Sequence, residues 1–255
     1  MTTHHTHIGT HTPETDRLLF RGQHTLRDLV GTVTFTQSIY LGVTGKIPTA
    51  AQTHILDACL VILVDHGITP SALVARVVAD SMPSDIQVSI AAGLLTVGNK
   101  FVGTMQGAGE LFARGISSDK SAVDFAAETV TQYLAQKKRF PGYGHPDYAT
   151  EDPRSARLFE VAEAAGVRGN HIALARCFAA EIKRQSGRNL VLNATGAIAA
   201  LLGEIDFPTV AMRGVAVVSR SAGLLAHALE ELERPTSAQT VALAQKAVPY
   251  SDEHL

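Results

Sequence analysis

A stretch near the middle of the chain combines cations, a glycine-rich turn and a histidine. It runs from Lys137 to His145 as KKRFPGYGH, and an Asp-Pro-Arg triplet ending at Arg154 follows shortly after. Glycines on both sides of Tyr143 let the backbone approach a ligand closely, and Pro141 fixes the angle at which the chain enters the turn. A histidine held at the end of such a loop can accept or deliver a proton near neutral pH. The alternative is a plain surface turn between two helices, and these residues alone leave both interpretations open.

Three further polar groups interrupt apolar sequence, and they contribute His66, Arg220 and Arg234. Arginine binds carboxylates through two parallel hydrogen bonds, so these arginines together with Arg154 fit a ligand that carries several carboxylates. Each residue also has an ordinary explanation: Arg154 and Arg234 as surface residues, and His66 as a histidine that bonds the carbonyls at a helix end. Arg220 lies in a strongly apolar segment, where an unpaired charge is costly, so it needs a partner. No acid in the sequence stands out as that partner.

The elements that carry these residues are predicted to be helices. Hydrophobic residues make up 45% of the chain, aromatic residues only 5%, and tryptophan is absent, which favours closely packed helices over a β-sandwich. No segment shows convincing strand alternation. Thr25, Thr49 and Ser84 are the expected N-caps of three helices. The predicted fold class is all-α, with helices near 35–41, 50–64, 71–79, 85–95, 121–136, 155–165, 171–185, 190–202 and 210–233.

Charge and composition exclude several classes of function. The net charge is −2 with acids and bases interspersed, so we expect no nucleic-acid partner. No uncharged apolar run reaches the ~18–20 residues that a membrane span needs, so we expect no membrane partner. Cys59 and Cys177 are interpreted as reduced, buried thiols of a cytoplasmic protein. Residues 1–17 are interpreted as a flexible polar tail, and the less favoured alternative is metal binding by its histidines His4, His5, His7 and His11.

Five short motifs follow one another in an order that matches a known family. They are Leu63–Gly67, Arg139–His145, Asp152–Arg154, Ser219–Gly223 and Glu233–Ser237. From about residue 18 to residue 237 the chain resembles the citrate synthase superfamily. Its Asp-His-Gly and Gly-His-Pro forms look most like stand-alone citryl-CoA lyases and the C-terminal lyase module of ATP-citrate lyase. Each motif alone is weak, but five in the right order are specific.

The resemblance implies a two-domain helical homodimer. The large domain would comprise residues 18–112 and 211–255, and a smaller domain, residues 113–210, would close over a CoA thioester. The residues implied to bind CoA are Arg139, Pro141, Gly142, Tyr143 and Gly144. Those implied to bind the four-carbon acid, as oxaloacetate or citrate, are His66, His145, Arg154, Arg220 and, from the neighbouring subunit, Arg234. No metal is implied, because the lyase chemistry does not need one and no ligand cluster is visible outside the histidine-rich tail. No tightly bound cofactor is implied either, because CoA enters and leaves as a thioester substrate or product.

Two positions depart from the family pattern. The histidine that holds the enolate oxygen in the synthases aligns with Gln106, and the aspartate that takes a proton from the acetyl-CoA methyl group aligns with Thr195. Gln106 can still donate a hydrogen bond to a thioester oxygen. Thr195 is no general base at neutral pH without an activating neighbour, and it could at most relay a proton through water. General bases contribute ~10²–10⁴-fold, so condensation should be the direction that suffers most.

The predicted function is cleavage of citryl-CoA, or a close 3-hydroxy-3-carboxyacyl-CoA, to acetyl-CoA and oxaloacetate. In this retro-aldol step the citryl hydroxyl loses a proton, and His145 is the residue placed to take it. Two alternatives stay open: a catalytically silent protein that senses citrate or an acyl-CoA, and condensation of an acyl-CoA with a keto acid as in the synthases. The expected catalytic residues are His145, His66, Gln106 and Thr195.

Overall fold

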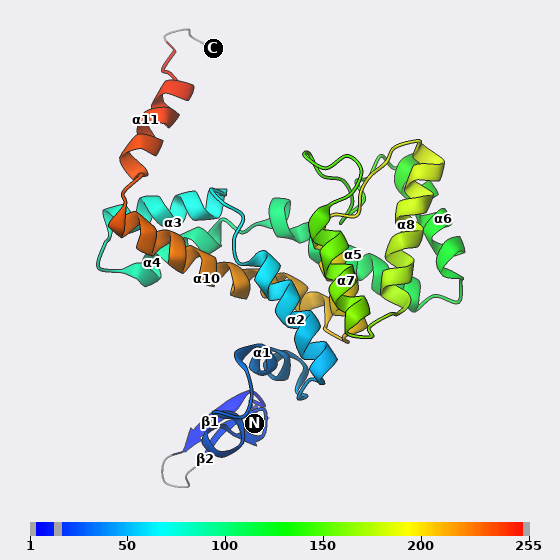
Figure 1. Cartoon of the computed structure of the whole chain (residues 1–255), viewed down its shortest axis with the longest axis horizontal. Coiled ribbons are helices and arrows are strands. Elements are labelled where there is room, and N and C mark those ends of the chain that lie inside the picture. The colour runs from blue at the N-terminus through cyan, green and yellow to red at the C-terminus, as the bar shows by residue number, and fades with distance from the viewer. Residues whose placement is uncertain (1–3, 13–16, 252–255) are drawn as a thin grey trace. The chain divides into compact units, whose positions relative to one another are not determined.

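The computed structural model describes residues 4–12 and 17–251, and most of these residues are helical (Figure 1). The short strands are β1 Gly9–Thr12, β2 Arg17–Phe20 and β3 Gln23–His24, and the short π-helix η2 Thr25–Leu29 follows them. The α-helices are α1 Phe35–Thr44, α2 Ala50–Leu63, α3 Pro70–Ser81, α4 Ile86–Leu95, α5 Asn99–Ile116, α6 Ala122–Ala135, α7 Pro153–Ala164, α8 Asn170–Ser186, α9 Ala194–Glu204, α10 Met212–Glu233 and α11 Ser237–Ala247. The 3-10 helix η3 Thr209–Ala211 precedes α10. The predicted predominance of helices is confirmed.

Reciprocal hydrogen bonds at two helix N-termini explain where α1 and α2 begin. Before α2, the Thr49 hydroxyl accepts from the backbone N–H of Gln52, and the Gln52 side chain accepts from the backbone N–H of Thr49. Thr34 and Gln37 form the same arrangement before α1. Each pair satisfies two backbone donors that the first turn leaves without partners. The predicted cap at Thr49 is therefore confirmed.

Two other predicted caps are wrong. The residue before α4 is Asp85 rather than Ser84, and its side chain makes no capping hydrogen bond. The residue before η2 is His24, whose ring accepts from the backbone N–H of Arg27. Thr25 cannot cap this helix because it is already its first residue.

The N-terminal segment contains a small antiparallel sheet that the sequence analysis did not predict. β1 pairs with β2, with Thr10 opposite Leu19, and β2 pairs with β3. The Arg21 guanidinium donates to the carbonyl of Gly42 in α1 through Nε (2.8 Å) and Nη2 (2.6 Å). Residues 9–12 of the expected flexible tail are thus a strand, while residues 1–3 and 13–16 lie outside the described residues. Strands of four and two residues show too few alternations to be recognised from sequence.

The chain divides into two compact units. Unit 1 comprises residues 1–59 and 103–213, and unit 2 comprises residues 60–102 and 214–255. The predicted large domain comprised residues 18–112 and 211–255, and the predicted small domain comprised residues 113–210. The observed division differs because it groups residues 1–59 with the central segment 103–213. One reason is Tyr40 of α1, whose hydroxyl donates to the carbonyl of Ile205 at 2.7 Å and whose ring lies 6.1 Å from that of Phe207. The domain bounds that the resemblance implies stay a prediction.

Unit 1 has its core among helices α5, α6, α8 and α9. Phe112 and Phe178 are fully buried, with ring centroids 6.1 Å apart. Residues 197–202 of α9 are fully buried as well, so other parts of the protein cover this helix on every side. The glycine-rich segment that forms α5 was not predicted to be a helix. Its glycines allow close packing, since a Cβ at Gly109 would lie 2.4 Å from the sulfur of Met212.

Unit 2 is built on α3, α4 and α10. Ala72 and Ala75 of α3 and Leu224 of α10 are fully buried and pack together. A Cβ at Gly93 in α4 would lie 2.7 Å from the carbonyl oxygen of Ser71, so the helices approach closely there. The absence of a side chain at Gly93 permits this approach.

Candidate active site

Backbone hydrogen bonds hold the loop before His145 against the start of α9. The N–H of Gly144 donates to the carbonyl of Val191 (2.7 Å), and the N–H of Asn193 donates to the carbonyl of Gly142 (3.0 Å). The Asn193 side chain donates to the carbonyl of Gly144 at 2.9 Å. Gly142 and Gly144 have φ angles of 82° and 88°, which glycine adopts without strain. Three backbone groups of Gly142 and Gly144, two of the residues expected to bind CoA, are therefore bonded within the chain.

The other residues predicted to bind CoA have different surroundings. Tyr143 is buried, and its hydroxyl donates to the carbonyl of Ala175 at 2.9 Å, which makes its ring part of the core. Pro141 packs beside α5, where a Cβ at Gly107 would lie 3.3 Å from the Pro141 Cβ. Arg139 is exposed. Among the five residues, Arg139 is thus the one with a charged side chain in solvent.

His145 ends the loop with a side chain that is 16% exposed. Its Nδ1 accepts a hydrogen bond from the backbone N–H of Asp147 at 3.1 Å, and the Asp147 carboxylate lies 3.7 Å from the same nitrogen. The ring lies against Tyr148, with centroids 4.6 Å apart. Because Nδ1 is an acceptor here, the neutral imidazole carries its proton on Nε2. In this state the Nε2 atom is a hydrogen-bond donor.

Arg154 lies in the first turn of α7 and is paired with Asp152. Its Nε and Nη2 donate to the two carboxylate oxygens at 2.9 and 2.7 Å. The fully buried Asp152 carboxylate also accepts from the backbone N–H of Ala194 at 3.0 Å, which ties α7 to α9. Burial raises the pKa of Asp152, but the bonds from Arg154 and Ala194 outweigh it and hold the pKa below its ordinary value. Within the described residues Nη1 of Arg154 makes no hydrogen bond, so one edge of the guanidinium is unused.

Thr195 and Gln106, the two departures from the family pattern, both belong to unit 1. The Thr195 hydroxyl donates to the side-chain oxygen of Asn193 (2.7 Å) and accepts from the hydroxyl of Thr104 (3.0 Å). Its bonding partners among the described residues include no base. The Gln106 amide donates to the exposed carboxylate of Glu110 at 2.9 Å, which leaves its second N–H for another acceptor.

The Asp-His-Gly motif lies in unit 2, just after α2. His66 is exposed, whereas the Asp65 carboxylate accepts from the N–H of Gly67 (2.9 Å) and is bonded to the His227 ring (2.8 Å). Burial raises the pKa of Asp65, but these hydrogen bonds outweigh it and lower the pKa below its ordinary value. The motif therefore carries an ionised aspartate whose carboxylate makes two hydrogen bonds, and the histidine next to it faces solvent.

Arg220 in α10 has the acid partner that the sequence could not identify. Among the described residues Asp65 is the one acid within 4.0 Å, and its Oδ1 lies 4.0 Å from Nη1 of Arg220. This separation is too long for a hydrogen bond, and the buried Nη1 atom has no other bonding partner in the described part of the chain. Burial lowers the pKa of Arg220, which the charge of Asp65 partly offsets. Arg220 therefore has an unused donor, which a carboxylate would satisfy.

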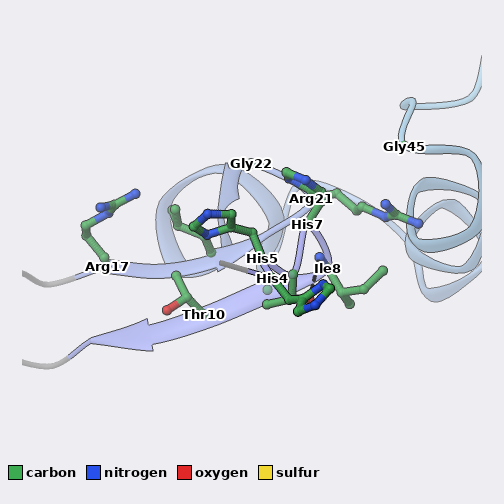
Figure 2. A pocket seen from close by; sticks show the side chains of 12 residues that line it. His4, His5, His7, Ile8, Thr10, Arg17, Arg21, Gly22 and Gly45 are labelled. Atoms are coloured by element: carbon green, nitrogen blue, oxygen red, sulfur yellow. Dashed lines mark hydrogen bonds between the residues drawn. The ribbon is translucent and has the colours of Figure 1, made fainter. Parts of the chain in front are cut away.

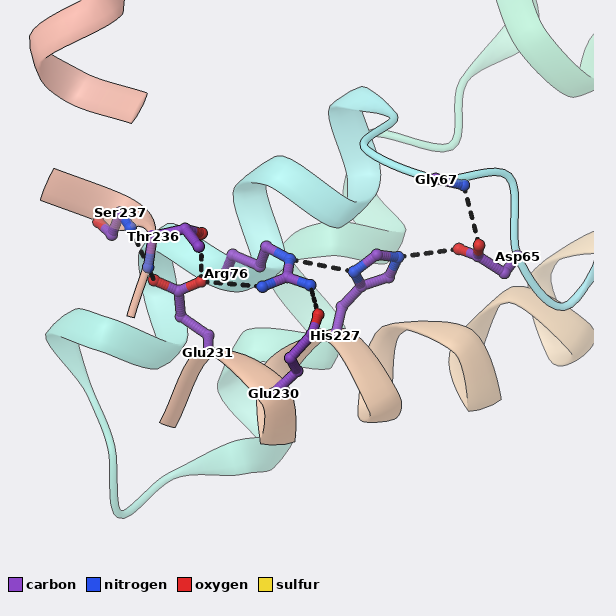
Figure 3. Close-up of polar contacts among 8 residues, drawn as sticks. All are labelled: Asp65, Gly67, Arg76, His227, Glu230, Glu231, Thr236 and Ser237. Atoms are coloured by element: carbon purple, nitrogen blue, oxygen red, sulfur yellow. Dashed lines mark hydrogen bonds and ion pairs between the residues drawn. The ribbon is translucent and has the colours of Figure 1, made fainter. Parts of the chain in front are cut away.

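A network of ion pairs and hydrogen bonds surrounds the buried Arg76 in unit 2 and was not predicted from the sequence (Figure 3). Arg76 of α3, only 5% exposed, donates to Nδ1 of His227 (3.0 Å) and to Glu231 (3.1 Å), and it also pairs with Glu230. Arg76 interrupts the apolar segment 71–79, and this is the same signal that singled out Arg220. An arginine within an apolar helical segment is thus a sequence signal for a buried ion pair at Arg76 as well.

Arg234 lies directly after α10 and is exposed. Its backbone N–H donates to the carbonyl of Glu230 at 2.7 Å. The next residues are fixed by the fully buried Glu231 carboxylate, which accepts from the N–H and hydroxyl of Thr236 (2.5 and 2.6 Å) and from the N–H of Ser237 (2.7 Å). The role of Arg234 in a neighbouring subunit stays a prediction.

The predicted site residues fall into two groups. Unit 1 holds the loop with His145, together with Gln106, Arg154 and Thr195. Unit 2 holds His66, Arg220 and Arg234, and it places Asp65 between His227 and Arg220. Sequence reasoning gave no role to Asp147, Asp152, Arg76 or His227. Asp147 contacts His145, Asp152 pairs with Arg154, and Arg76 with His227 holds Asp65.

The histidine-rich N-terminal segment lines a separate pocket of about 680 Å³ (Figure 2). His4, His5 and His7 lie there with Arg17 and Arg21, and no predicted site residue takes part. In the described part of the chain no three His, Cys, Asp or Glu side chains are grouped so that they could hold a metal ion. No described helix is long and apolar enough to cross a membrane.

Comparison with known proteins agrees with this fold. The family model for the citrate synthase C-terminal domain matches residues 50–238. The solved structure of citryl-CoA lyase from Hydrogenobacter thermophilus is 36% identical with a TM-score of 0.89, covering 100% of this chain and 96% of that one. ATP citrate lyase from Methanothrix soehngenii, solved with citrate and coenzyme A, is 23% identical with a TM-score of 0.77, covering 100% of this chain and 42% of that one, and this likeness concerns the fold alone.

Among curated proteins, the citrate synthase of Heyndrickxia coagulans is 27% identical over 193 residues, which is 75% of this chain and 50% of that protein. The chain spans about half the length of the curated relatives it matches. The family match over residues 50–238 covers most of the chain, and so the protein belongs to the citrate synthase family. This family includes both citrate synthases and citryl-CoA lyases.

Proposed function

We propose that this protein cleaves citryl-CoA, or a close 3-hydroxy-3-carboxyacyl-CoA, to acetyl-CoA and oxaloacetate. The observation that carries the proposal is the environment of Thr195. At the position where the family resemblance expects the proton-abstracting aspartate, Thr195 is bonded to an amide and a hydroxyl. The carbonyl-binding histidine and the arginines are nevertheless retained. The likeness to citryl-CoA lyase, with 36% identity and a TM-score of 0.89, supports the same assignment.

Two arginines offer donors for the substrate carboxylates. Arg220 has the buried Nη1 without a hydrogen bond, and Arg154 has an Nη1 that its bond to Asp152 does not use. Guanidinium donors of this kind bind carboxylates strongly. For the CoA half, the exposed cations Lys137, Lys138 and Arg139 provide attraction to phosphates. Because backbone groups of the glycine loop are bonded to residues 191–193, we assign the phosphate contacts to these side chains.

Cleavage breaks the bond between the carbinol carbon and the CH₂ next to the thioester. His145 accepts the hydroxyl proton, the hydroxyl oxygen becomes the keto oxygen of oxaloacetate, and the electron pair moves into the thioester as an enolate. Gln106 donates its second amide N–H to the enolate oxygen. Water then protonates the enolate carbon to give acetyl-CoA, and the hydroxide that remains takes the proton from His145, which restores both the water and the neutral ring. No aspartate is therefore needed at residue 195.

The hydrogen bonds of His145 set a condition on this step. With Nδ1 accepting from Asp147 N–H, the neutral ring has its proton on Nε2 and cannot accept another there. The ring must first carry its proton on Nδ1, where the Asp147 carboxylate at 3.7 Å stabilises it. His145 and Asp147 thus form the proposed proton-transfer pair.

We further propose that the protein acts as a homodimer, with Arg234 contributing to the neighbouring site. An apolar stripe on α10 supports self-association. Val218, Leu225, Leu229 and Leu232 are all exposed, and their spacing places them on one face of the helix. Exposed apolar residues gathered on one face of a helix are typical of protein–protein contacts.

The experiment is a coupled assay of purified protein with citryl-CoA, in which malate dehydrogenase and NADH report oxaloacetate. We expect turnover that falls by at least about 100-fold in His145→Ala, within the ~10²–10⁴-fold range of general bases. Turnover at background, equal in wild type and variant, would contradict the proposal. Tight citrate or CoA binding without turnover would instead indicate a binding protein, and CoA release from keto acids with acyl-CoA would indicate condensation.

A further inference from the structure

A continuous chain of hydrogen bonds links Asp65 to the segment after α10 (Figure 3). It passes from Asp65 through His227 to Arg76, and from Arg76 through Glu231 to Thr236. All members belong to unit 2. His227 is the central member, and the proposed chemistry does not use it.

The donor chemistry of Arg76 determines the tautomer of His227. A guanidinium Nε carries a hydrogen and no lone pair, so Arg76 Nε can only donate to His227 Nδ1, at 3.0 Å. Nδ1 is therefore the acceptor, and the proton of the neutral ring lies on Nε2. His227 consequently donates through Nε2 to Oδ1 of Asp65 at 2.8 Å. Arg76 makes His227 a directed donor toward Asp65.

This donor controls how close Asp65 comes to Arg220. Oδ1 of Asp65 is bonded to His227, and Oδ2 is bonded to the N–H of Gly67 at 2.9 Å. With both oxygens engaged, Oδ1 remains 4.0 Å from Nη1 of Arg220, beyond hydrogen-bond distance. The Nη1 donor is left without a hydrogen bond. Without His227, the carboxylate is released to form a direct charge-assisted bond with Arg220, the contact that a substrate carboxylate needs.

We propose that His227 is a positioning residue that holds Asp65 back from Arg220 and so keeps the Arg220 guanidinium available to a carboxylate of the substrate. This inference rests on the proposed function, because that function assigns a polycarboxylate to Arg220. His227 itself touches no reacting atom. It acts by preventing an internal acid from occupying the place of the ligand.

Two amide substitutions at His227 form a matched pair. In His227→Asn the side-chain oxygen lies near the former Nδ1 and can still accept from Arg76, but the amide is too short to reach Asp65. In His227→Gln the longer side chain places an amide N–H near the former position of Nε2, from where it can donate to Asp65. Both variants are neutral and polar, so they differ chiefly in their contact with Asp65. Thermal melts check that both are folded.

The whole 255-residue chain is titrated with citrate and, separately, with CoA by calorimetry. We expect His227→Asn to weaken citrate binding by about 10-fold, on the order of one charge-assisted hydrogen bond, with CoA binding unchanged. His227→Gln should stay within about 3-fold of wild type. In an Asp65→Asn background the competing charge is gone, so the effect of His227→Asn should shrink to within about 2-fold. A merely structural role for His227 would not depend on the charge of Asp65.

Several results would overturn the inference. They are equal citrate affinity in wild type and His227→Asn, equal losses in the Asn and Gln variants, an undiminished loss in the Asp65→Asn background, or no citrate binding by wild type. If His227→Asn does not fold, Asp65→Asn alone decides, because it should bind citrate at least as tightly as wild type. The outcome is separable from the proposed function. Absence of citryl-CoA turnover with the expected binding pattern would contradict the lyase and leave the positioning role of His227 standing.

Discussion

Asp147 contacts Nδ1 of His145 through both its backbone N–H and its carboxylate, and so it influences which ring nitrogen carries the proton. Its backbone N–H favours the Nε2–H tautomer, whereas its carboxylate, 3.7 Å from Nδ1, stabilises the proton on the opposite nitrogen. Only the second state lets Nε2 accept the citryl hydroxyl proton. Asp147 therefore has a role in the proposed reaction through its contact with His145, although it is not itself one of the residues predicted to bind the substrate.

We predict that Asp147→Asn lowers the rate of citryl-CoA turnover by about 3- to 10-fold, a modest loss because the carboxylate is largely solvent-exposed. Citrate affinity should not change, since the arginines are untouched. Steady-state kinetics combined with citrate titration measures both quantities. Asp147→Glu, which keeps the charge, is the control, and a turnover number for Asp147→Asn equal to that of wild type would contradict the assignment.

Among the elements, the loop before His145 depends on two glycines in different ways. Both have positive φ, but a Cβ at Gly142 would lie 2.7 Å from the Cα of Gly196 in α9, whereas at Gly144 the nearest atom is a Leu190 methyl at 3.8 Å. Gly142 is required by close packing and by conformation. Gly144 is required by conformation alone.

We predict that Gly144→Ala lowers the free energy of unfolding by about 1 kcal/mol, the cost of a positive φ. Gly142→Ala should cost about 2–4 kcal/mol, because the loop must also move away from α9. Chemical denaturation of both variants measures the difference. Equal losses would mean that the loop is not packed against α9 as described.

Asp152 joins two other elements, α7 and α9, through its bonds to Arg154 and Ala194. Its folded-state pKa is lowered, so its contribution to stability is present above the unfolded-state pKa near 3.8 and is lost as pH falls through the lower folded-state value. We predict that Asp152→Asn lowers the free energy of unfolding by about 3 kcal/mol at neutral pH. The difference from wild type should shrink below pH 3.8. Urea titrations at pH 7 and about pH 3 test this, and a pH-independent difference would contradict it.

At the scale of the whole molecule, the proposed homodimer makes the site a shared one. If Arg220 acts in its own subunit and Arg234 in the neighbouring one, each single variant loses both sites of its homodimer. A mixed dimer of Arg220→Ala and Arg234→Ala subunits has one site with both lesions and one intact site. Exposed Arg234 and the apolar stripe on α10 are the features that support this arrangement.

We predict that mixing the two inactive variants in equal amounts restores about a quarter of the wild-type activity, because half of the randomly assorted dimers are mixed and each has one intact site. Subunits are exchanged by mild denaturation and refolding, and turnover is assayed as for wild type. Light scattering confirms the dimer mass. Two separately refolded variants serve as the baseline, and no recovery in verified mixed dimers would place both arginines in one subunit's site.

Local signals predicted the helices well and the short strands poorly. Thr49 and the apolar periodicity after it correctly indicated α2 because both depend on neighbouring residues. The glycines around Gln106 obscured α5, whose close approach to residues such as Met212 explains why small residues occur there. The strands at Gly9–Thr12 and Arg17–Phe20 are stabilised by pairing with each other rather than by their own pattern.

By itself the sequence determined the helical class, the family resemblance and the residue types offered to a polycarboxylate and a CoA thioester. Those properties depend on composition, periodicity and short motifs. Only the tertiary structure decided which residues orient the predicted site residues. Arg76 is hydrogen-bonded to His227, 151 residues away in the sequence, and Asp65 is hydrogen-bonded to His227, 162 residues away. No local spacing encodes such contacts, because they arise when separate helices pack. The buried polar groups then determine one another's partners, tautomers and charge.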